Sequence, residues 1–188
     1  MVGIINVLQH TTELALHMCQ AYVDKDGAAV DATCGNGNDT LWLAKRCKKV
    51  YAFDIQDNAI EATAKLLQTE GQSNVVLIKD SHENMREYVK EKPCIIVFNL
   101  GFLPGGDKGI TTNREGSMRA IESALEILAV GGVLCVTMYP GHPEGALEQA
   151  RILEWAKALD SRKYHAVFAN MLNQSERAPQ VIWITKKK

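Results

Sequence analysis

The sequence predicts an α/β fold, in which a mostly parallel, seven-stranded sheet ends in an antiparallel hairpin and carries helices on both faces. Three observations support this class. Seven short apolar runs are spaced along the 188 residues, the first five are separated by segments of helical period, and the last two have no helix between them. Strands buried on both faces appear as nearly continuous apolar runs, and helices between them allow parallel crossovers.

The first five apolar runs are the expected parallel strands. They are residues 28–33, 49–55, 74–80, 94–100 and 132–139. The expected helices between and after them are residues 39–46, 57–70, 82–90, 114–129 and 144–159. Only a short polar turn separates the runs 164–171 and 178–185, so these two strands have to be antiparallel.

The N-terminal segment has leucines and alanines at helical spacing over residues 7–23. This spacing predicts a helix that packs ahead of the first strand. Hydrophobic residues make up 46% of the sequence, which is enough to build a full core. We therefore expect one domain over residues 1–188, with residues 1–25 as a helical segment packed on it.

Composition narrows the class of function. With a formal net charge of −1, the protein as a whole does not attract nucleic acid electrostatically. Any contact with RNA therefore has to come from local basic patches. The chain has no run of eighteen apolar residues and no signal-peptide pattern, so a cytoplasmic protein without a membrane span is expected. Four of the five cysteines stand beside apolar residues in expected helices or strands and none forms a C-x-x-C pair, which indicates buried thiols. We expect neither disulfides nor a metal.

The loop after the first strand, in the stretch DATCGNGNDT (31–40), has the composition of a nucleotide-binding turn. Gly35 and Gly37 follow the strand, and Asp39 opens the next helix. Backbone N–H groups at such a helix start can face a ligand. A lone G-x-G also occurs in ordinary tight turns, and Cys34 in this loop has no neighbouring base that would make it a nucleophile.

Acidic residues at the ends of the next two strands strengthen the binding interpretation. Asp54 ends the second strand nineteen positions after Gly35, where a carboxylate can accept hydrogen bonds from ribose hydroxyls. Asp80 ends the third strand and is followed by Ser81 and His82, where an adenine ring would lie.

Asp31 separates the two ligand classes that fit this loop. A dinucleotide loop normally closes with a third glycine, but here that position is Thr40, and the loop carries Asn36 and Asn38. Carboxylates at Asp31 and Asp39 would repel a diphosphate, whereas they suit a ligand with ammonium and sulfonium centres and no phosphate. That ligand is S-adenosylmethionine (SAM), and the pattern of glycines and acids resembles that of class I methyltransferases. A capped glycine turn without a ligand and a dinucleotide site are the alternatives.

The fourth strand ends in FNLGFLPGGDK, at the edge of the sheet where ligands bind in such folds. Residues 99–102, Asn-Leu-Gly-Phe, resemble the Asn-Pro-Pro-Tyr/Phe element of amino-group methyltransferases, with Leu-Gly in place of Pro-Pro. In that element an amide oxygen and a backbone carbonyl accept hydrogen bonds from an amino group, and the aromatic ring stacks on the substrate base. Asn99 and Phe102 are therefore candidate catalytic residues; a strand cap and a core side chain are the alternative roles. Asp107 is either a base for the amine or part of a solvated turn.

The fifth strand and the final hairpin add residues to the same edge. Tyr139 and His142 end the fifth strand, and for His142 a role in loop structure competes with a role in catalysis. The candidate basic contacts to RNA are Lys108, Arg114, Arg119 and Arg177. A homodimer would enlarge the surface that this small chain offers to RNA.

Six stretches together resemble one family, the bacterial tRNA 5-aminomethyl-2-thiouridine methyltransferases, long catalogued as rRNA methylases. The stretches are DATCGNGNDT, FDIQ, DSHEN, FNLGFLPGGDK, YPGHPEG and APQVIWITK, and the resemblance covers nearly the whole chain. It implies a Rossmann-like class I methyltransferase that uses SAM to methylate the exocyclic aminomethyl group of the wobble uridine, with the tRNA anticodon region as partner. The positions that match the family's donor contacts are Asn36, Asn38, Asp54, Gln56, Ser81 and His82, and Ile55 lies within FDIQ.

Three other functions fit part of this pattern. A methyltransferase for an rRNA base or a small-molecule amine would keep the donor site and change only the acceptor. A non-catalytic nucleoside-binding module would keep SAM or its product as a ligand. An NAD-dependent oxidoreductase would bind NADH instead, and the carboxylate of Asp31 argues against it.

Overall fold

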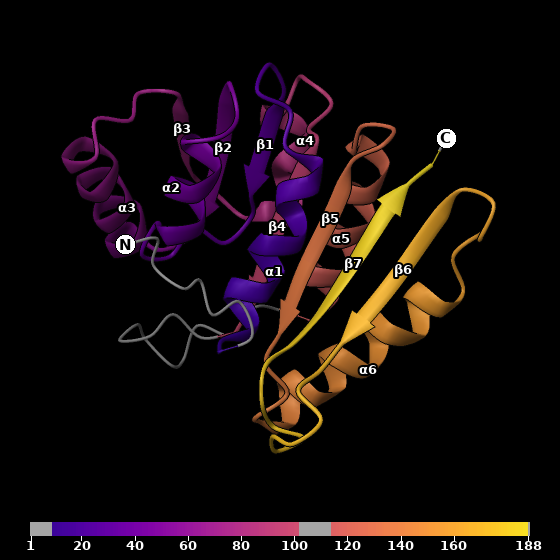
Figure 1. Ribbon diagram of the computed structural model, residues 1–188. Coiled ribbons are helices and arrows are strands. Elements are labelled where there is room, and N and C mark those ends of the chain that lie inside the picture. The colour runs from indigo at the N-terminus through magenta and orange to yellow at the C-terminus, as the bar shows by residue number, and fades with distance from the viewer. Residues whose placement is uncertain (1–8, 102–113, 188) are drawn as a thin grey trace, which may run out of the picture.

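Seven strands form a single sheet with the order β3-β2-β1-β4-β5-β7-β6 (Figure 1). The computed structural model describes residues 9–101 and 114–187. The strands are β1 Ala28–Asp31, β2 Lys49–Asp54, β3 Val75–Lys79, β4 Ile95–Leu100, β5 Val133–Met138, β6 Tyr164–Ala169 and β7 Gln180–Lys186. Pairing from β3 through β5 is parallel, whereas β7 is antiparallel to both β5 and β6. The predicted fold class is confirmed, including the final hairpin.

Helices cover both faces of the sheet, as predicted. They are α1 Thr11–Cys19, α2 Asn38–Ala44, α3 Asp57–Thr69, α4 Met85–Tyr88, α5 Arg114–Ile127 and α6 Pro143–Lys157, with short 3-10 helices at Gln20–Tyr22 and His82–Asn84. Side chains of α1, α2 and α3 share one buried cluster with one face of the sheet, and those of α4, α5 and α6 share a second cluster with the other face. Neighbouring strand residues alternate between the clusters, so each strand is apolar on both sides.

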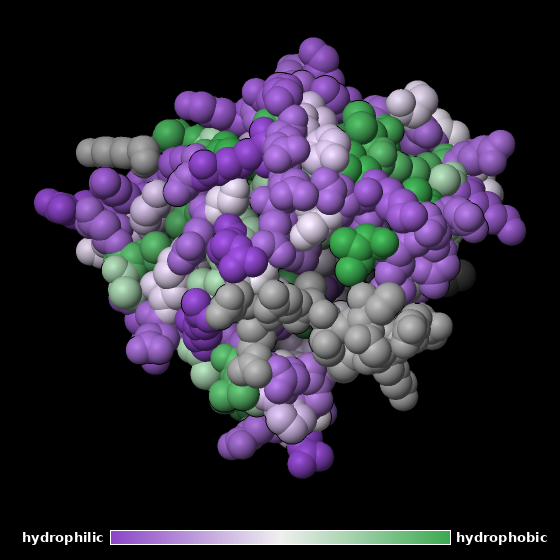
Figure 2. All heavy atoms as spheres, turned by 180° about the vertical axis from the view of Figure 1, so that it is seen from behind, coloured by the Kyte–Doolittle hydropathy of each residue, from purple (hydrophilic) through white to green (hydrophobic). Residues whose placement is uncertain are grey.

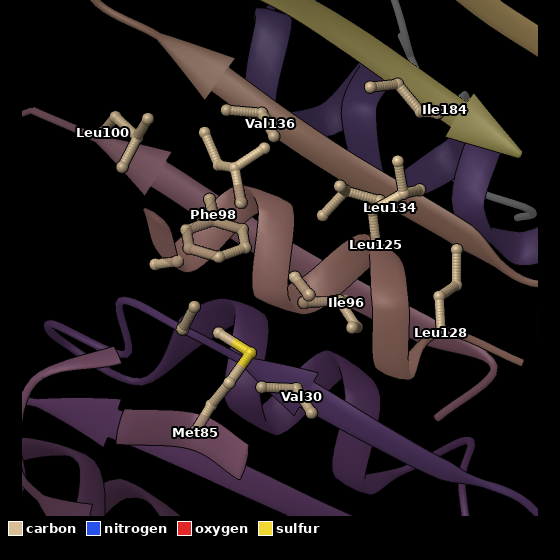
Figure 3. Close-up of a cluster of buried hydrophobic side chains, with 14 of the residues drawn as sticks. Val30, Met85, Ile96, Phe98, Leu100, Leu125, Leu128, Leu134, Val136 and Ile184 are labelled. Atoms are coloured by element: carbon tan, nitrogen blue, oxygen red, sulfur yellow. The ribbon is translucent and has the colours of Figure 1, made fainter. Parts of the chain in front are cut away.

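Figure 3 shows part of the second cluster. Met85 of α4 points toward Val30 of β1, and Phe98 of β4 lies near Val136 of β5. The outer side of the helices over this cluster is mostly hydrophilic, with some apolar side chains exposed among the polar ones (Figure 2). Among the described residues, no helix has the length and apolar character needed to cross a membrane.

One helix differs in kind from the sequence prediction, and other elements differ at their ends: α1 covers Thr11–Cys19 of the expected 7–23, and α2 ends at Ala44 instead of residue 46. The helix expected over 82–90 is a 3-10 turn at His82–Asn84 followed by one α-helical turn, and the chain leaves helical geometry at Val89 (ψ 108°). Val89 is buried in the same cluster as Met85, so burial of this side chain outweighs the helical period of the segment. The expected helix 114–129 ends at Ile127, two residues early.

The N-terminal helix α1 precedes β1 in sequence but lies against strands from the other end of the chain. The indole Nε1–H of Trp183 on β7 donates to the backbone oxygen of Ala15 at 3.2 Å. The hydroxyl of Thr11 donates to the backbone oxygen of Pro179 at 3.1 Å. Helix α1 therefore covers β5 and β7, a placement that helical spacing alone does not determine (Figure 1).

Candidate active site

The loop between β1 and α2 is held in an open turn by backbone geometry and by α3. Gly35 and Gly37 have φ of 49° and 83°, which side chains with a Cβ rarely adopt. A Cβ at Gly37 would also lie 2.9 Å from the hydroxyl oxygen of Thr63 on α3. That hydroxyl donates to the backbone oxygen of Gly35 at 3.0 Å. Both glycines are therefore required by this turn, and Thr63 is a supporting residue that the sequence analysis missed.

Asp54, at the end of β2, ties this loop to the second strand. Its carboxylate accepts hydrogen bonds from the backbone N–H groups of Gly35 and Gln56, each at 3.0 Å. The next residue, Ile55, leaves 49% of its surface exposed, which is unusual for a large apolar side chain at a strand end. Asp54 and Ile55 thus place a carboxylate and an apolar surface side by side at the sheet edge.

The end of β3 is organised by hydrogen bonds within its own turn. The Asp80 carboxylate accepts from the Tyr88 hydroxyl at 2.8 Å and from the Asn84 amide at 3.0 Å, and these donors lower the pKa of Asp80. The Ser81 hydroxyl oxygen accepts from the backbone N–H of Glu83 and so caps the 3-10 helix. Asp80 therefore shapes the turn in which Ser81 stands.

His82 is buried between the ends of two strands. Its Nδ1–H donates to the backbone oxygen of Ala32 at 3.1 Å, and its ring packs edge-on against Phe98 of β4. Burial lowers the pKa of His82, so the ring is neutral at pH 7. This position joins the loop after β1 to β4.

Two acidic side chains lie inside the loop after β1. Asp31 is fully buried and accepts hydrogen bonds from the Thr40 hydroxyl at 2.6 Å and from the backbone N–H of Thr33 at 3.1 Å. Burial raises the pKa of Asp31 to about 7, and the charge of Asp39 adds to the shift. Burial also raises the pKa of Asp39, while a hydrogen bond from Asn99 lowers it. The site therefore places two acidic side chains close together with little access to water, which favours their protonated forms.

Asn99 approaches this acidic loop from the end of β4. Its side-chain Nδ2 donates to Asp39 Oδ2 at 2.6 Å, and its backbone N–H donates to the Thr33 hydroxyl oxygen at 2.7 Å. No described residue donates to the side-chain oxygen of Asn99. The neighbouring Gly101 lies against Tyr139, because a Cβ at position 101 would be 2.9 Å from that ring. The structure therefore brings together Asp39, Asn99 and Tyr139, which are far apart in sequence.

The remaining predicted residues lie around the same edge or outside the described residues. His142 caps α6, because its Nδ1 accepts from the backbone N–H of Gly145 at 3.1 Å. Arg177 is exposed in the turn of the final hairpin, and its backbone oxygen would be 3.4 Å from a Cβ at Gly141. Arg119 pairs with Glu83 at 2.7 Å.

Asn36 is exposed in the loop after β1, Asn38 is exposed at the start of α2, and Arg114 opens α5. Phe102, Asp107, Lys108 and the side chain of Arg114 lie outside the described residues.

Comparison with known proteins identifies the family. The sequence matches the family described as "Putative rRNA methylase" over residues 50–185. The chain belongs to this family. A chloroplastic tRNA (mnm5s2U34)-methyltransferase from Arabidopsis thaliana is 34% identical over 200 residues, which cover 99% of this chain and 73% of the relative. The chain is thus a SAM-dependent methyltransferase of class I, as the sequence predicted.

Solved structures of related methylases agree with the fold. A Clostridium thermocellum protein of the same family description has 36% sequence identity and a TM-score of 0.91, with 95% of this chain and 98% of the other covered. A Streptococcus mutans protein in complex with S-adenosylhomocysteine (SAH) has 35% identity and a TM-score of 0.88, with 95% and 99% covered. The SAH complex of the Streptococcus mutans protein supports SAM and SAH as the ligand pair of this methyltransferase.

The charges of the loops after β1, β2 and β3 suit SAM better than a dinucleotide. The segments 31–40, 54–57 and 80–84 contain six acidic residues, of which Asp57 pairs with Lys79 and Glu83 with Arg119, and the segments themselves have neither lysine nor arginine. Such a site favours a cationic ligand over a diphosphate. The same burial raises the pKa of the Cys34 thiol to about 12, so this cysteine is a poor nucleophile at neutral pH. All five cysteines are free and buried, as expected for four of them.

Proposed function

We propose that this enzyme methylates the exocyclic aminomethyl group of 5-aminomethyl-(2-thio)uridine at the wobble position of tRNA. The observation that carries this proposal is the orientation of Asn99. Its amide nitrogen is turned toward Asp39, so its oxygen is available to accept a hydrogen bond from an amine. The activity of the Arabidopsis relative, which covers nearly the whole chain, points to the same acceptor.

The donor would lie across the loops after β1, β2 and β3. SAM supplies an activated methyl group, and in-line transfer of such a group depends mainly on positioning. The residues proposed to hold the donor are Asp31, Gly35, Asn36, Gly37, Asn38, Asp54, Ile55, Gln56, Asp80, Ser81 and His82. Of these, Ile55 offers an exposed apolar surface to the adenine ring, and Asp54 offers its remaining lone pairs to the ribose.

The acceptor amine has to lose a proton before it can attack. An alkylamine with a pKa near that of lysine is charged at pH 7, and freeing its lone pair costs roughly 4–5 kcal/mol. The partly buried carboxylate of Asp39 attracts the ammonium form to the site, and the Asn99 oxygen then directs the amine. Phe102 and Asp107, which lie outside the described residues, keep the roles proposed from the sequence: stacking on the base and accepting the proton.

The anticodon region would approach along the edge formed by Tyr139, His142 and the final hairpin. Arg177 is exposed there, and Arg114 is the first residue of α5. A wobble base is already unpaired, so it can reach a site that lacks a separate RNA-binding domain. A cytoplasmic homodimer is part of this proposal, because a second subunit would widen the surface for the anticodon arm.

The test is transfer of radiolabelled methyl from SAM to tRNA from cells that accumulate the unmethylated aminomethyl uridine. We expect incorporation at the wobble nucleoside, and a loss of about 100-fold or more in kcat for Asn99→Ala. Gln68→Ala is the control, since this exposed amide lies near the far end of α3. Labelling of rRNA or of a small-molecule amine in place of tRNA would refute the proposed acceptor but leave the donor site intact.

A further inference from the structure

We propose that Asp39 is a positioning residue that determines which end of the Asn99 amide faces the acceptor amine. This inference rests on the proposed function, because it concerns how Asn99 receives an amine. Asp39 is in the first turn of α2, and Asn99 is in β4, sixty positions later. Their side chains meet at 2.6 Å, a short distance for a hydrogen bond between an amide and a carboxylate.

An asparagine amide has two ends of nearly equal size and opposite hydrogen-bonding character. A carboxylate only accepts hydrogen bonds, so the ionised Asp39 selects the Nδ2 end of Asn99 and repels the oxygen. The backbone of Asn99 is held separately, by its N–H bond to the Thr33 hydroxyl at 2.7 Å. With the backbone fixed, the only freedom left to this side chain is rotation, and Asp39 restricts it.

The orientation of the amide decides what the site can bind. With Nδ2 on Asp39, the Asn99 oxygen faces the opposite side and can accept from an –NH₂ or –NH₃⁺ group. A rotated amide would present its own N–H groups to the amine, which would block binding by a like donor. Among the described residues only Asp39 fixes this choice, since Asp31 is engaged by Thr40 and Thr33.

A double-mutant cycle on kcat tests the inference, with Asp39→Ala, Asn99→Ala and the double variant assayed at saturating tRNA and SAM. We expect Asp39→Ala to lower kcat about 10- to 100-fold while the Kd of SAM changes less than about threefold. In the Asn99→Ala background the same substitution should cause no further loss, because no amide remains to be positioned. Asp39→Asn should fall between wild type and Asp39→Ala, since an amide at position 39 can pair with either end of Asn99. Asp160→Asn, which removes a partly exposed carboxylate bound to Arg162, is the control.

Each outcome separates the inference from the proposed function. If the fold-losses in kcat of the two single variants multiply in the double variant, Asp39 acts independently of Asn99, and the inference is overturned. A full rate in Asp39→Ala and Asp39→Asn, together with a slow Asn99→Ala, would also overturn it while leaving the proposed function intact. A full rate in Asn99→Ala would instead refute the role of Asn99 in the proposed function. If Asp39→Ala does not fold, the comparison of Asp39→Asn with and without Asn99→Ala gives the same test.

Discussion

Replacing Asp31 with asparagine should raise the stability of the ligand-free protein, and the gain should grow with pH. The folded-state pKa of Asp31 is about 7 against an ordinary value of 3.8. This difference corresponds to about 4 kcal/mol of destabilisation once the carboxyl is ionised. An asparagine fits the same position, because its oxygen can accept from the Thr33 N–H while its amide donates to the Thr40 hydroxyl oxygen.

The pH window follows from the direction of the Asp31 shift. Because the folded-state pKa is raised, the penalty is absent below pH 4, grows between pH 4 and pH 7, and is fully present above pH 7. Urea unfolding of both proteins at pH 5 and pH 8 should therefore show a gain for Asp31→Asn that is about 3 kcal/mol larger at pH 8. Asp39 and Asp54 add to the field at Asp31 in the wild type. A difference between the two proteins that stays constant from pH 5 to pH 8 would refute the reasoning.

Three further predictions concern the loop after β1, α1 and the RNA edge. Gly37→Ala should destabilise the protein by about 2 kcal/mol in urea unfolding, because φ is positive there and the new Cβ would contact Thr63. Gly71→Ala is the control: φ is 65°, but no atom lies within 4 Å of the new Cβ, so the loss should be about 1 kcal/mol. Trp183→Phe should cost about 1–2 kcal/mol in the same assay, because a buried backbone oxygen of α1 loses its donor. Arg177→Ala should raise the KM for tRNA severalfold at low salt, and reduce the salt dependence of tRNA binding without altering the Kd of SAM.

The sheet could be predicted from the sequence because its strands are buried on both faces. Each of the seven apolar runs corresponds to one strand, and the turn without a helix gave the antiparallel pair. The turn at His82 could not be predicted in the same way, since the segment has a helical period and only tertiary packing of Val89 ends the helix early. The position of α1 also depends on a partner far away in sequence, Trp183.

In the candidate site, too, features set by neighbouring residues could be predicted, and contacts between distant residues could not. Gly35, Gly37 and Asp54 could be found from their spacing, because the chemistry of that loop is local. The pairing of Asp39 with Asn99 could not, since it joins side chains that are sixty positions apart. The role of Thr63 could not be predicted from the sequence either, because nothing in the sequence distinguishes this threonine from other buried residues of a helix. The spacing of residues in the sequence therefore predicts which segments form the site, whereas the packing of the fold determines which of their side chains are in contact.

The acidic side chains that destabilise the free protein should also affect which ligand it binds. Asp31 and Asp39 lie close enough for each charge to affect the other, in loops without a lysine or arginine. SAM carries an ammonium and a sulfonium in addition to its carboxylate, whereas SAH has lost the sulfonium charge. The carboxylate of Asp31 should therefore favour SAM over SAH at pH 8, where this acid is ionised to a larger extent than at pH 5.

Asp31→Asn tests this link between stability and ligand choice. Calorimetric titrations at pH 8 should show that the substitution weakens binding of SAM more than binding of SAH, because only SAM loses an attraction between opposite charges at the sulfonium. At pH 5, where Asp31 is mostly protonated in the wild type, the two proteins should discriminate between the ligands to the same extent. Equal weakening of SAM and SAH at pH 8 would mean that Asp31 acts on the shape of the loop and not through its charge. The same acids would then destabilise the fold without helping the protein to distinguish substrate from product.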